Sequence, residues 1–375
     1  MANLPGKYIP WMLVAAAGIA PAQKSVTHEG TAGLQLSNGK VELVVLPLGG
    51  AFVSFVHTAD AKRINPMWDP AKMAREAGGR QTFGSSRGHF LCVDGFGPVT
   101  KEEQAAGLPG HGEAHRLPWE VVSSKDTEVT FRVRLPMVQE VLTRKISMAA
   151  GEPVVLVEST LESELPFDRV ILWGEHATIG APFLKLGKTV VDASSTRCQT
   201  KPFQEQGPRT FPNAVDFDWP QAPGGVNVRV TPATDGVMNH IGCLMDPQRE
   251  MEFITALNTE ENLMLGYVFP RKDFAWVQHW MHYPSSKMYA WGLEFGMQPY
   301  DMTKREIVGM TPMFGFPTFR WLGAKSKIST KFLMFLTKAP AGFSRVDDVR
   351  VERGQLIVED RTAGLKISMP ASKGL

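Results

Sequence analysis

Cysteine is scarce in this chain of 375 residues, which contains three of them. They are widely spaced, at Cys92, Cys198 and Cys243, and none forms a CxxC pair or another spacing typical of metal ligands. An odd number leaves at least one thiol unpaired, so we do not expect stability to depend on disulfides. One bridge is possible in an oxidising compartment, and the sequence does not indicate which pair would form it.

An excess of charge is also missing, because 40 Lys and Arg residues are balanced by 38 Asp and Glu residues. The basic residues are scattered and not interleaved with aromatic residues, which argues against a nucleic-acid partner. With so little net charge, no electrostatic attraction to an anionic membrane is expected. We therefore expect a small or uncharged partner and leave the oligomeric state open.

Several motifs of nucleotide and metal chemistry are absent. The sequence has no Walker A motif, no HExxH, and no GxGxxG that follows a strand and opens a helix. His279 and His282 are three residues apart, but in an expected strand such positions point to opposite faces, so a shared metal is not expected. The sequence therefore predicts no metal site and no cofactor.

No apolar run is long enough to span a bilayer comfortably, since a spanning helix needs about 20 apolar residues. Lys7 precedes a shorter apolar run over residues 8–20, which ends in Ala20-Pro21-Ala22 before Gln23. This pattern predicts a signal peptide over residues 1–22 and a mature domain over 23–375 that is periplasmic or secreted and outside the membrane. The alternative is a merely apolar N-terminal segment.

Helical patterns are few. Short helices are expected at 69–77, with Asp69 as N-cap and Pro70 in the first turn, at 100–106 and at 301–308. Strand patterns run from end to end, and Val129, Phe131 and Val133 alternate with polar residues. Further strands are expected at 41–46, 51–57, 138–148, 153–162, 226–231, 252–257, 262–269, 274–282, 288–295, 328–337, 355–359 and 364–369.

So many strands with so little helix indicate packed antiparallel sheets, and a parallel sheet with helical crossovers is disfavoured. The length would allow two or three average domains or one large all-β domain. We expect a single all-β sandwich. Residues 195–225 are rich in Pro and Gly and are expected to form the longest loop, either a surface loop or an insertion near a site.

Three polar motifs lie in strand-like sequence: GHGEAHRLPWEV at 110–121, WGEHATIGAPFL at 173–184 and YAWGLEFGMQP at 289–299. They contribute His111, His176 and Glu294, which are 65 and 118 residues apart along the chain. Only a folded domain could bring these side chains into one cleft. Two histidines and a carboxylate suit proton transfer near neutral pH, because histidine both donates and accepts and a partly dry carboxylate can act as a base.

These motifs resemble elements of the aldose 1-epimerases, or galactose mutarotases, and their hexose-phosphate relatives. The run VLPLGGAFVSFVHTADAKRINPMW at 45–68 resembles the early part of the same family, and all four segments occur in the family's order. The resemblance implies a galactose-mutarotase-like supersandwich of large antiparallel sheets with a few short helices. It also implies a small-molecule carbohydrate as the partner, bound on a concave face.

The resemblance also implies roles for individual residues. Glu294 would take the proton from the anomeric hydroxyl O1, His176 would protonate the ring oxygen O5, and His111 would stabilise charge near the reacting centre. Arg87 would orient sugar hydroxyls, and Asp273 is a candidate for the sugar-binding aspartate by position only. The chain departs from the family at residues 177–180, which read Ala-Thr-Ile-Gly where an aromatic pair is typical.

Structural alternatives exist for each of these residues. His111 lies between glycines and could be a turn histidine, and His176 could pair with its neighbour Glu175. Glu294 could point outward from its strand by alternation. Arg87 could be structural, with Arg116 as a residue that could be mistaken for it in function. Trp280 could stack on a sugar or belong to the core.

Three functions are compatible with the motifs. The first is an exported isomerase that interconverts α and β anomers of a free sugar. The second is a non-catalytic carbohydrate-binding protein of the cell envelope with the same fold. The third, a polysaccharide lyase or hydrolase relative, is disfavoured because no second carboxylate motif occurs at a recognisable spacing.

Overall fold

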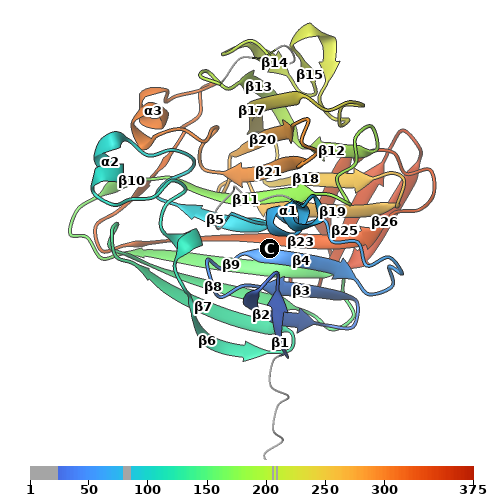
Figure 1. Cartoon of the computed structure of the whole chain (residues 1–375), viewed down its shortest axis with the longest axis horizontal. Coiled ribbons are helices and arrows are strands. Elements are labelled where there is room, and N and C mark those ends of the chain that lie inside the picture. Colours follow the sequence, from blue (N-terminus) through green and yellow to red (C-terminus); the bar gives the residue numbers. More distant parts are fainter. Residues whose placement is uncertain (1–23, 79–85, 205–206, 208–209) are drawn as a thin grey trace, which may run out of the picture.

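Two large antiparallel β-sheets form the body of the protein in a computed structural model, which describes residues 24–78, 86–204, 207 and 210–375 (Figure 1). The expected signal peptide over residues 1–22 lies outside the described residues. None of the helices in the described part of the chain has the length and apolar character needed to cross a membrane.

The first sheet has eleven strands and carries two of the three polar motifs, whereas the motif at 110–121 runs through turns into the first strand residues of the second sheet. Its strands, in spatial order, are β1 (Lys24–His28), β2 (Thr31–Ser37), β3 (Val41–Val45), β4 (Phe52–His57), β5 (His89–Val93), β11 (Trp173–Gly180), β21 (Ala290–Gly296), β20 (Trp276–Tyr283), β17 (Val237–Met245), β13 (Ser195–Thr200) and β14 (Asp216–Asp218).

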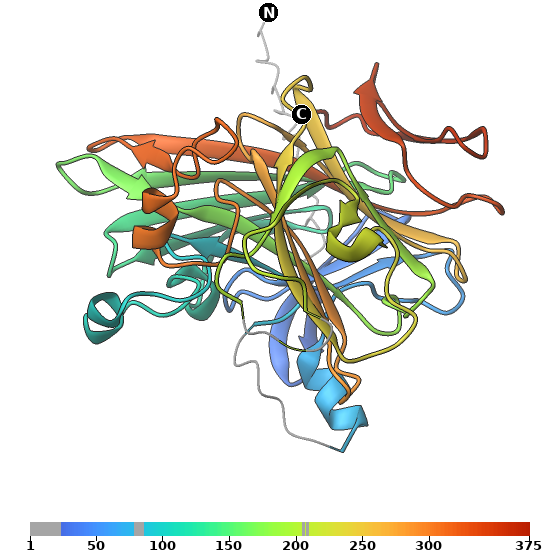
Figure 2. The same ribbon diagram turned by 90° about the horizontal axis from the view of Figure 1, so that it is seen from above.

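The second sheet has eight strands. In spatial order they are β12 (Thr189–Ala193), β18 (Met251–Asn258), β19 (Leu263–Pro270), β23 (Lys327–Lys338), β9 (Val154–Ser163), β8 (Glu140–Met148), β7 (Glu128–Leu135) and β6 (Glu120–Lys125). Three C-terminal strands, β24 (Asp348–Glu352), β25 (Gln355–Asp360) and β26 (Leu365–Pro370), form a separate sheet, which Figure 2 shows in red beside the larger ones.

Short elements complete the fold. Two small two-stranded sheets pair β10 (Arg169–Ile171) with β22 (Arg320–Leu322) and β15 (Gln221–Ala222) with β16 (Val226–Asn227). The helices are α1 (Pro70–Glu76), α2 (Lys101–Ala105) and α3 (Lys304–Gly309), and the 3₁₀ turns are η1 (Ala114–Arg116) and η2 (Pro223–Gly225).

The main core lies between the two large sheets. The expected alternation in β7 is confirmed, because Val129, Phe131, Val133 and Leu135 are buried in this core while Arg132 is exposed. The C-terminal sheet covers part of the outer face of the eight-stranded sheet and forms a second apolar cluster with it. The predicted all-β class is confirmed.

The short helices also form close to the expected places. In α1 the Asp69 side chain accepts a hydrogen bond from the Lys72 amide and Pro70 occupies the first turn, as the sequence predicted. Helices α2 and α3 each begin with a capping box.

Two expectations from the sequence are wrong in detail. The strand expected at 226–231 is limited to Val226–Asn227, because the chain turns immediately afterwards. The segment expected to be a loop, 195–225, contains β13 and β14. Cys198 of β13 forms a disulfide with Cys243 of β17, so this segment is tied to the neighbouring strand. Cys92 is a buried free thiol.

A buried ionic contact joins the two sheets. Arg144 of β8 donates to Glu175 of β11 over 2.5 Å, and His89 of β5 lies 2.9 Å from the other oxygen of Glu175. All three side chains are almost completely buried. Burial alone would raise the pKa of Glu175, but Arg144 and His89 outweigh burial and lower it, so the carboxylate stays ionised.

We predict that Glu175→Ala lowers the free energy of unfolding by about 3–5 kcal/mol, because it leaves the buried Arg144 charge without a partner. Urea denaturation measures the change. The matched control is Glu164→Ala, which breaks the exposed Arg134–Glu164 pair and should change stability by less than about 1 kcal/mol. Equal effects of the two substitutions would contradict a special role for the contact between the sheets.

Candidate active site

A cavity of about 190 Å³ lies on one face of the eleven-stranded sheet. Five adjacent strands, β5, β11, β21, β20 and β17, each contribute one side chain to it, and loops contribute the rest. The described lining residues are Trp68, Ser86, Phe90, His111, His176, His240, Trp280, Glu294 and Asp301. The volume lies below the roughly 300–1,000 Å³ of pockets for drug-sized ligands, which suits one small ring.

His176 and Glu294 face each other across two neighbouring strands. The Nε2 atom of His176 lies 3.2 Å from Oε1 of Glu294, and its Nδ1 atom lies 2.9 Å from the Thr178 hydroxyl. Strand alternation sends Glu175 to the opposite face, where it contacts His89 and Arg144. In the structure, therefore, His176 pairs with Glu294 and not with Glu175.

Burial shifts the pKa values of Glu294 and His176 in the directions that favour their uncharged forms. It raises the pKa of Glu294 well above its ordinary value of 4.5, and the nearby Asp301 charge adds to this effect. It lowers the pKa of His176 well below 6.5. The two groups together therefore hold one proton over a wide pH range, and that proton can reside on either partner without a change in net charge.

His111 is placed by a tight turn. Its backbone φ is 64°, and the next residue, Gly112, has no room for a side chain because an added Cβ would lie 1.9 Å from the Val93 carbonyl oxygen. The Gly97 amide donates to Nδ1 of His111 over 3.2 Å, which leaves the proton of the neutral ring on Nε2. Burial lowers the pKa of His111 to about 4, so the ring is a neutral donor at neutral pH.

Asp301 completes the polar lining and was missed by the sequence reasoning. Lys201 and His240 both contact its Oδ1 atom, His240 at 3.1 Å. Burial would raise the pKa of Asp301, but His240 and Lys201 outweigh burial and lower it, so this carboxylate is ionised. No local sequence motif predicts the contact of Asp301 with Lys201, because these two residues are 100 residues apart in the chain.

Aromatic rings form the apolar part of the cavity. The Phe90 ring stacks on the His176 ring at a centroid distance of 4.2 Å, and Trp68 and Trp280 meet edge to face at 5.8 Å. Trp280, one of the expected sugar-binding residues, thus lies at the cavity, and its role there stays a prediction.

Two other expected binding residues lie elsewhere. Arg87 donates to the Thr31 hydroxyl over 3.2 Å and is not among the described residues that line the cavity, although its neighbour Ser86 is. Asp273 follows β19 and accepts a hydrogen bond from the Lys331 amide, next to a different cavity. The structure therefore brings together His111, His176, Glu294 and Trp280, but not Arg87 or Asp273.

Ser86 is the serine of a GxSxG spacing at residues 84–88. It precedes β5, whereas the nucleophile elbow of hydrolases follows a strand and opens a helix. The described residues around it therefore do not have the local geometry of a serine nucleophile.

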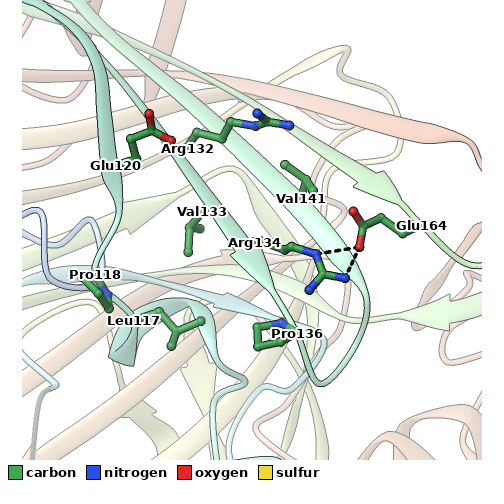
Figure 3. Close-up of a pocket in the computed structure, with 9 residues that line it drawn as sticks. All are labelled: Leu117, Pro118, Glu120, Arg132, Val133, Arg134, Pro136, Val141 and Glu164. Carbon is green, nitrogen blue, oxygen red and sulfur yellow. Dashed lines mark hydrogen bonds and ion pairs between the residues drawn. The ribbon is translucent and has the colours of Figure 1, made fainter.

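A larger cavity of about 440 Å³ lies over β6, β7 and β8 of the other sheet (Figure 3). The Arg134–Glu164 ion pair lies at its margin, and its described lining has no histidine. Its larger volume does not make it the better active-site candidate, because it lacks the acid and base pair. Among the described residues, no group of three or more His, Cys, Asp or Glu side chains is arranged to hold a metal ion.

The fold is that of the galactose-mutarotase-like proteins. No family model matches the sequence, and no curated protein matches it. Among solved structures, a proposed aldose 1-epimerase from Klebsiella pneumoniae matches with a TM-score of 0.61 and 13% identity over 83% of this chain and 80% of the other.

A galactose mutarotase related enzyme from Lactobacillus acidophilus matches with a TM-score of 0.58 and 12% identity over 85% of this chain and 100% of the other. A galactose mutarotase-like protein from Clostridium acetobutylicum has a TM-score of 0.57 at 12% identity, over 85% of this chain and 99% of the other. The resemblance inferred from the motifs is thus confirmed at the level of the fold.

We predict that Gly292→Ala displaces the Glu294 carboxylate. A Cβ at Gly292 would lie 2.1 Å from Oε1 of Glu294, and the flexible carboxylate moves more easily than the backbone. A crystal structure of the variant should show the His176–Glu294 distance increased beyond 3.2 Å with the strands unchanged. An unchanged distance would contradict the packing argument.

Proposed function

We propose that the protein is an aldose 1-epimerase-like isomerase that interconverts the α and β anomers of a free sugar. The observation that carries the proposal is the contact of His176 with Glu294, 3.2 Å apart, inside a buried cavity large enough for one sugar ring. The solved structures of similar fold include proteins with mutarotase names, which supports the reaction class at low identity.

The chemistry requires an acid and a base close together. Both O1 and O5 are bonded to C1, so the group that removes the O1 proton and the group that protonates O5 must be neighbours. In the proposed direction Glu294 accepts from O1–H while His176 donates to O5, and the ring opens to the aldehyde. Rotation about C1–C2 and the reverse transfers close the other anomer.

The opening step leaves the pair with the same net charge, because one proton enters at Glu294 and one leaves from His176. The pair then consists of a neutral carboxylic acid and a neutral imidazole, the state that burial favours. On ring closure Glu294 returns its proton to O1, and His176 takes the proton back from O5. Each positioned proton-transfer group of this kind contributes typically about 10²–10⁴-fold to the rate.

Two further groups support binding. His111 supplies a neutral N–H donor for an oxygen near the reacting carbon, since its Nδ1 atom is occupied by the Gly97 amide. Asp301 is an ionised acceptor for sugar hydroxyls, held in place by Lys201 and His240. The aromatic lining, including Trp280, provides an apolar surface for the C–H face of a sugar.

Export to the periplasm or the medium is part of the proposal. The Cys198–Cys243 disulfide supports it, because such bonds persist mainly in oxidising compartments. The N-terminal sequence pattern of residues 1–22 also supports it.

We predict that Glu294→Gln lowers the catalysed mutarotation rate by about 10²–10⁴-fold, because the amide cannot accept the O1 proton. Polarimetry of freshly dissolved α-D-glucose and α-D-galactose measures the rate. Glu252→Gln is the matched control, since Glu252 is a buried carboxyl of β18, remote from the cavity lining, that accepts from Ser194 over 2.6 Å.

Two outcomes would change the interpretation. Unchanged activity of Glu294→Gln would remove Glu294 as the base. If the wild-type protein accelerates mutarotation of no sugar but binds sugars in calorimetry, the non-catalytic binding protein becomes the better description.

The pH dependence of kcat/KM provides a further prediction. Because the pKa of His176 is lowered from 6.5 and that of Glu294 is raised from 4.5, the pair keeps its single proton across the neutral range. The profile should be flat around neutrality, fall on the acid side below pH 6.5 as His176 gains a proton, and fall on the alkaline side as Glu294 loses its proton. A midpoint near 6.5 on the acid side would contradict a buried, neutral His176.

A further inference from the structure

A group of unpaired cations surrounds the turn between β19 and β20. Arg271 and Lys272 lie in this turn, and Arg320 begins β22 beside it. None of the three forms an ion pair with a carboxylate of the described residues, whereas Arg249 and Lys338 are paired with Asp348 and Asp60. The guanidinium of Arg320 approaches only the Lys272 carbonyl oxygen, at 3.5 Å.

These three cations line one cavity of about 260 Å³. The rest of its described lining is mostly apolar and includes two phenylalanines; it comprises Asp273, Ala275, Met297, Phe316, Pro317 and Phe319. The one acidic residue among them, Asp273, is 7% exposed and accepts a hydrogen bond from the Lys331 amide. Lys272 and Arg320 attract its carboxylate at longer range, so one negative charge offsets part of the three positive charges. The cavity therefore presents positive charge beside an apolar floor.

An exposed tryptophan extends the aromatic surface. Trp321 has 64% of its surface exposed, which is unusual for so large an apolar side chain. Its ring lies 5.8 Å from the ring of Phe319, which lines the cavity. Flat exposed aromatic rings can stack on the C–H faces of sugars. Three cations without a carboxylate partner within ion-pair distance can bind carboxylates, although Nε of Arg271 already donates to the Arg249 carbonyl oxygen over 3.0 Å.

We propose that this surface, formed by Arg271, Lys272, Phe319, Arg320 and Trp321, is a second binding site whose ligand is a carboxylated saccharide, such as an oligouronate. A neutral sugar would leave the cations without partners, and a bare anion would leave the aromatic rings uncovered. Its described lining shares no residue with the cavity that contains His176 and Glu294. The site therefore stands independently of anomer interconversion.

The positive surface continues into the two neighbouring cavities. Lys272 and Lys331 line both of them and Arg271 lines one, while each also has one glutamate, Glu250 or Glu158. Only the cavity of Arg271, Lys272 and Arg320 combines three cations with phenylalanine rings among these three described linings, so the uronate carboxylates should lie against it.

Isothermal titration calorimetry at low ionic strength with trigalacturonic acid and with its methyl ester tests the proposal. The acid should bind and the neutral ester should bind much more weakly, and added NaCl should weaken binding of the acid. Lys272→Gln/Arg320→Gln should weaken acid binding by roughly twofold to thirtyfold, the range for two exposed charge pairs. Trp321→Ala should weaken binding without changing the salt dependence.

Two variants act as controls. Lys125→Gln/Arg132→Gln removes two exposed cations from β6 and β7 and should bind like the wild type. Glu294→Gln should also bind normally, whether or not it abolishes mutarotation. Circular dichroism verifies that each variant is folded.

The proposal is overturned if the wild-type protein does not bind the acid, if acid and ester bind equally, or if Lys272→Gln/Arg320→Gln binds like the wild type. Inorganic phosphate is the remaining probe. If phosphate binds as tightly as trigalacturonic acid and displaces that acid, the surface is a simple anion site. The assignment of a carboxylated saccharide as the ligand is then wrong.

Discussion

Arg144 and Glu175 meet between the two large sheets, almost without contact with water, and this contact fixes which way β11 faces. Because side chains alternate along a strand, a Glu175 that points inward to Arg144 sends His176 to the opposite face. The same alternation places His89 beside Glu175 and Phe90 beside His176. One buried ion pair thus couples the packing of the sheets to the orientation of the proposed acid.

Much of this arrangement could be predicted from the sequence. The strand patterns and the near absence of helical periodicity predicted antiparallel sheets, and three motifs led to His111, His176 and Glu294, which the structure brings to one cavity. Glu294 carried a local signal, since a carboxylate in a strongly apolar strand must be satisfied or functional. The catalytic roles of these residues stay predictions.

The remaining features depend on contacts that no local pattern reveals. Asp301 lies beyond the end of β21 and depends on Lys201, 100 residues away. His111 reaches the cavity through a turn with positive φ, as its flanking glycines allowed, but the sequence does not reveal that this turn packs against Val93. Asp273 was chosen by position along the chain, and position does not show that the turn after β19 lies beside another cavity.

The division of the cavity among five neighbouring strands has a consequence for how such proteins diverge. Each strand must preserve one outward side chain and an apolar inner face, and most other positions are constrained only by hydrophobicity and volume. A lineage can therefore replace nearly all of its sequence while the sheet order survives. The TM-score of 0.61 at 13% identity to the Klebsiella protein shows that the same fold forms from two very different sequences.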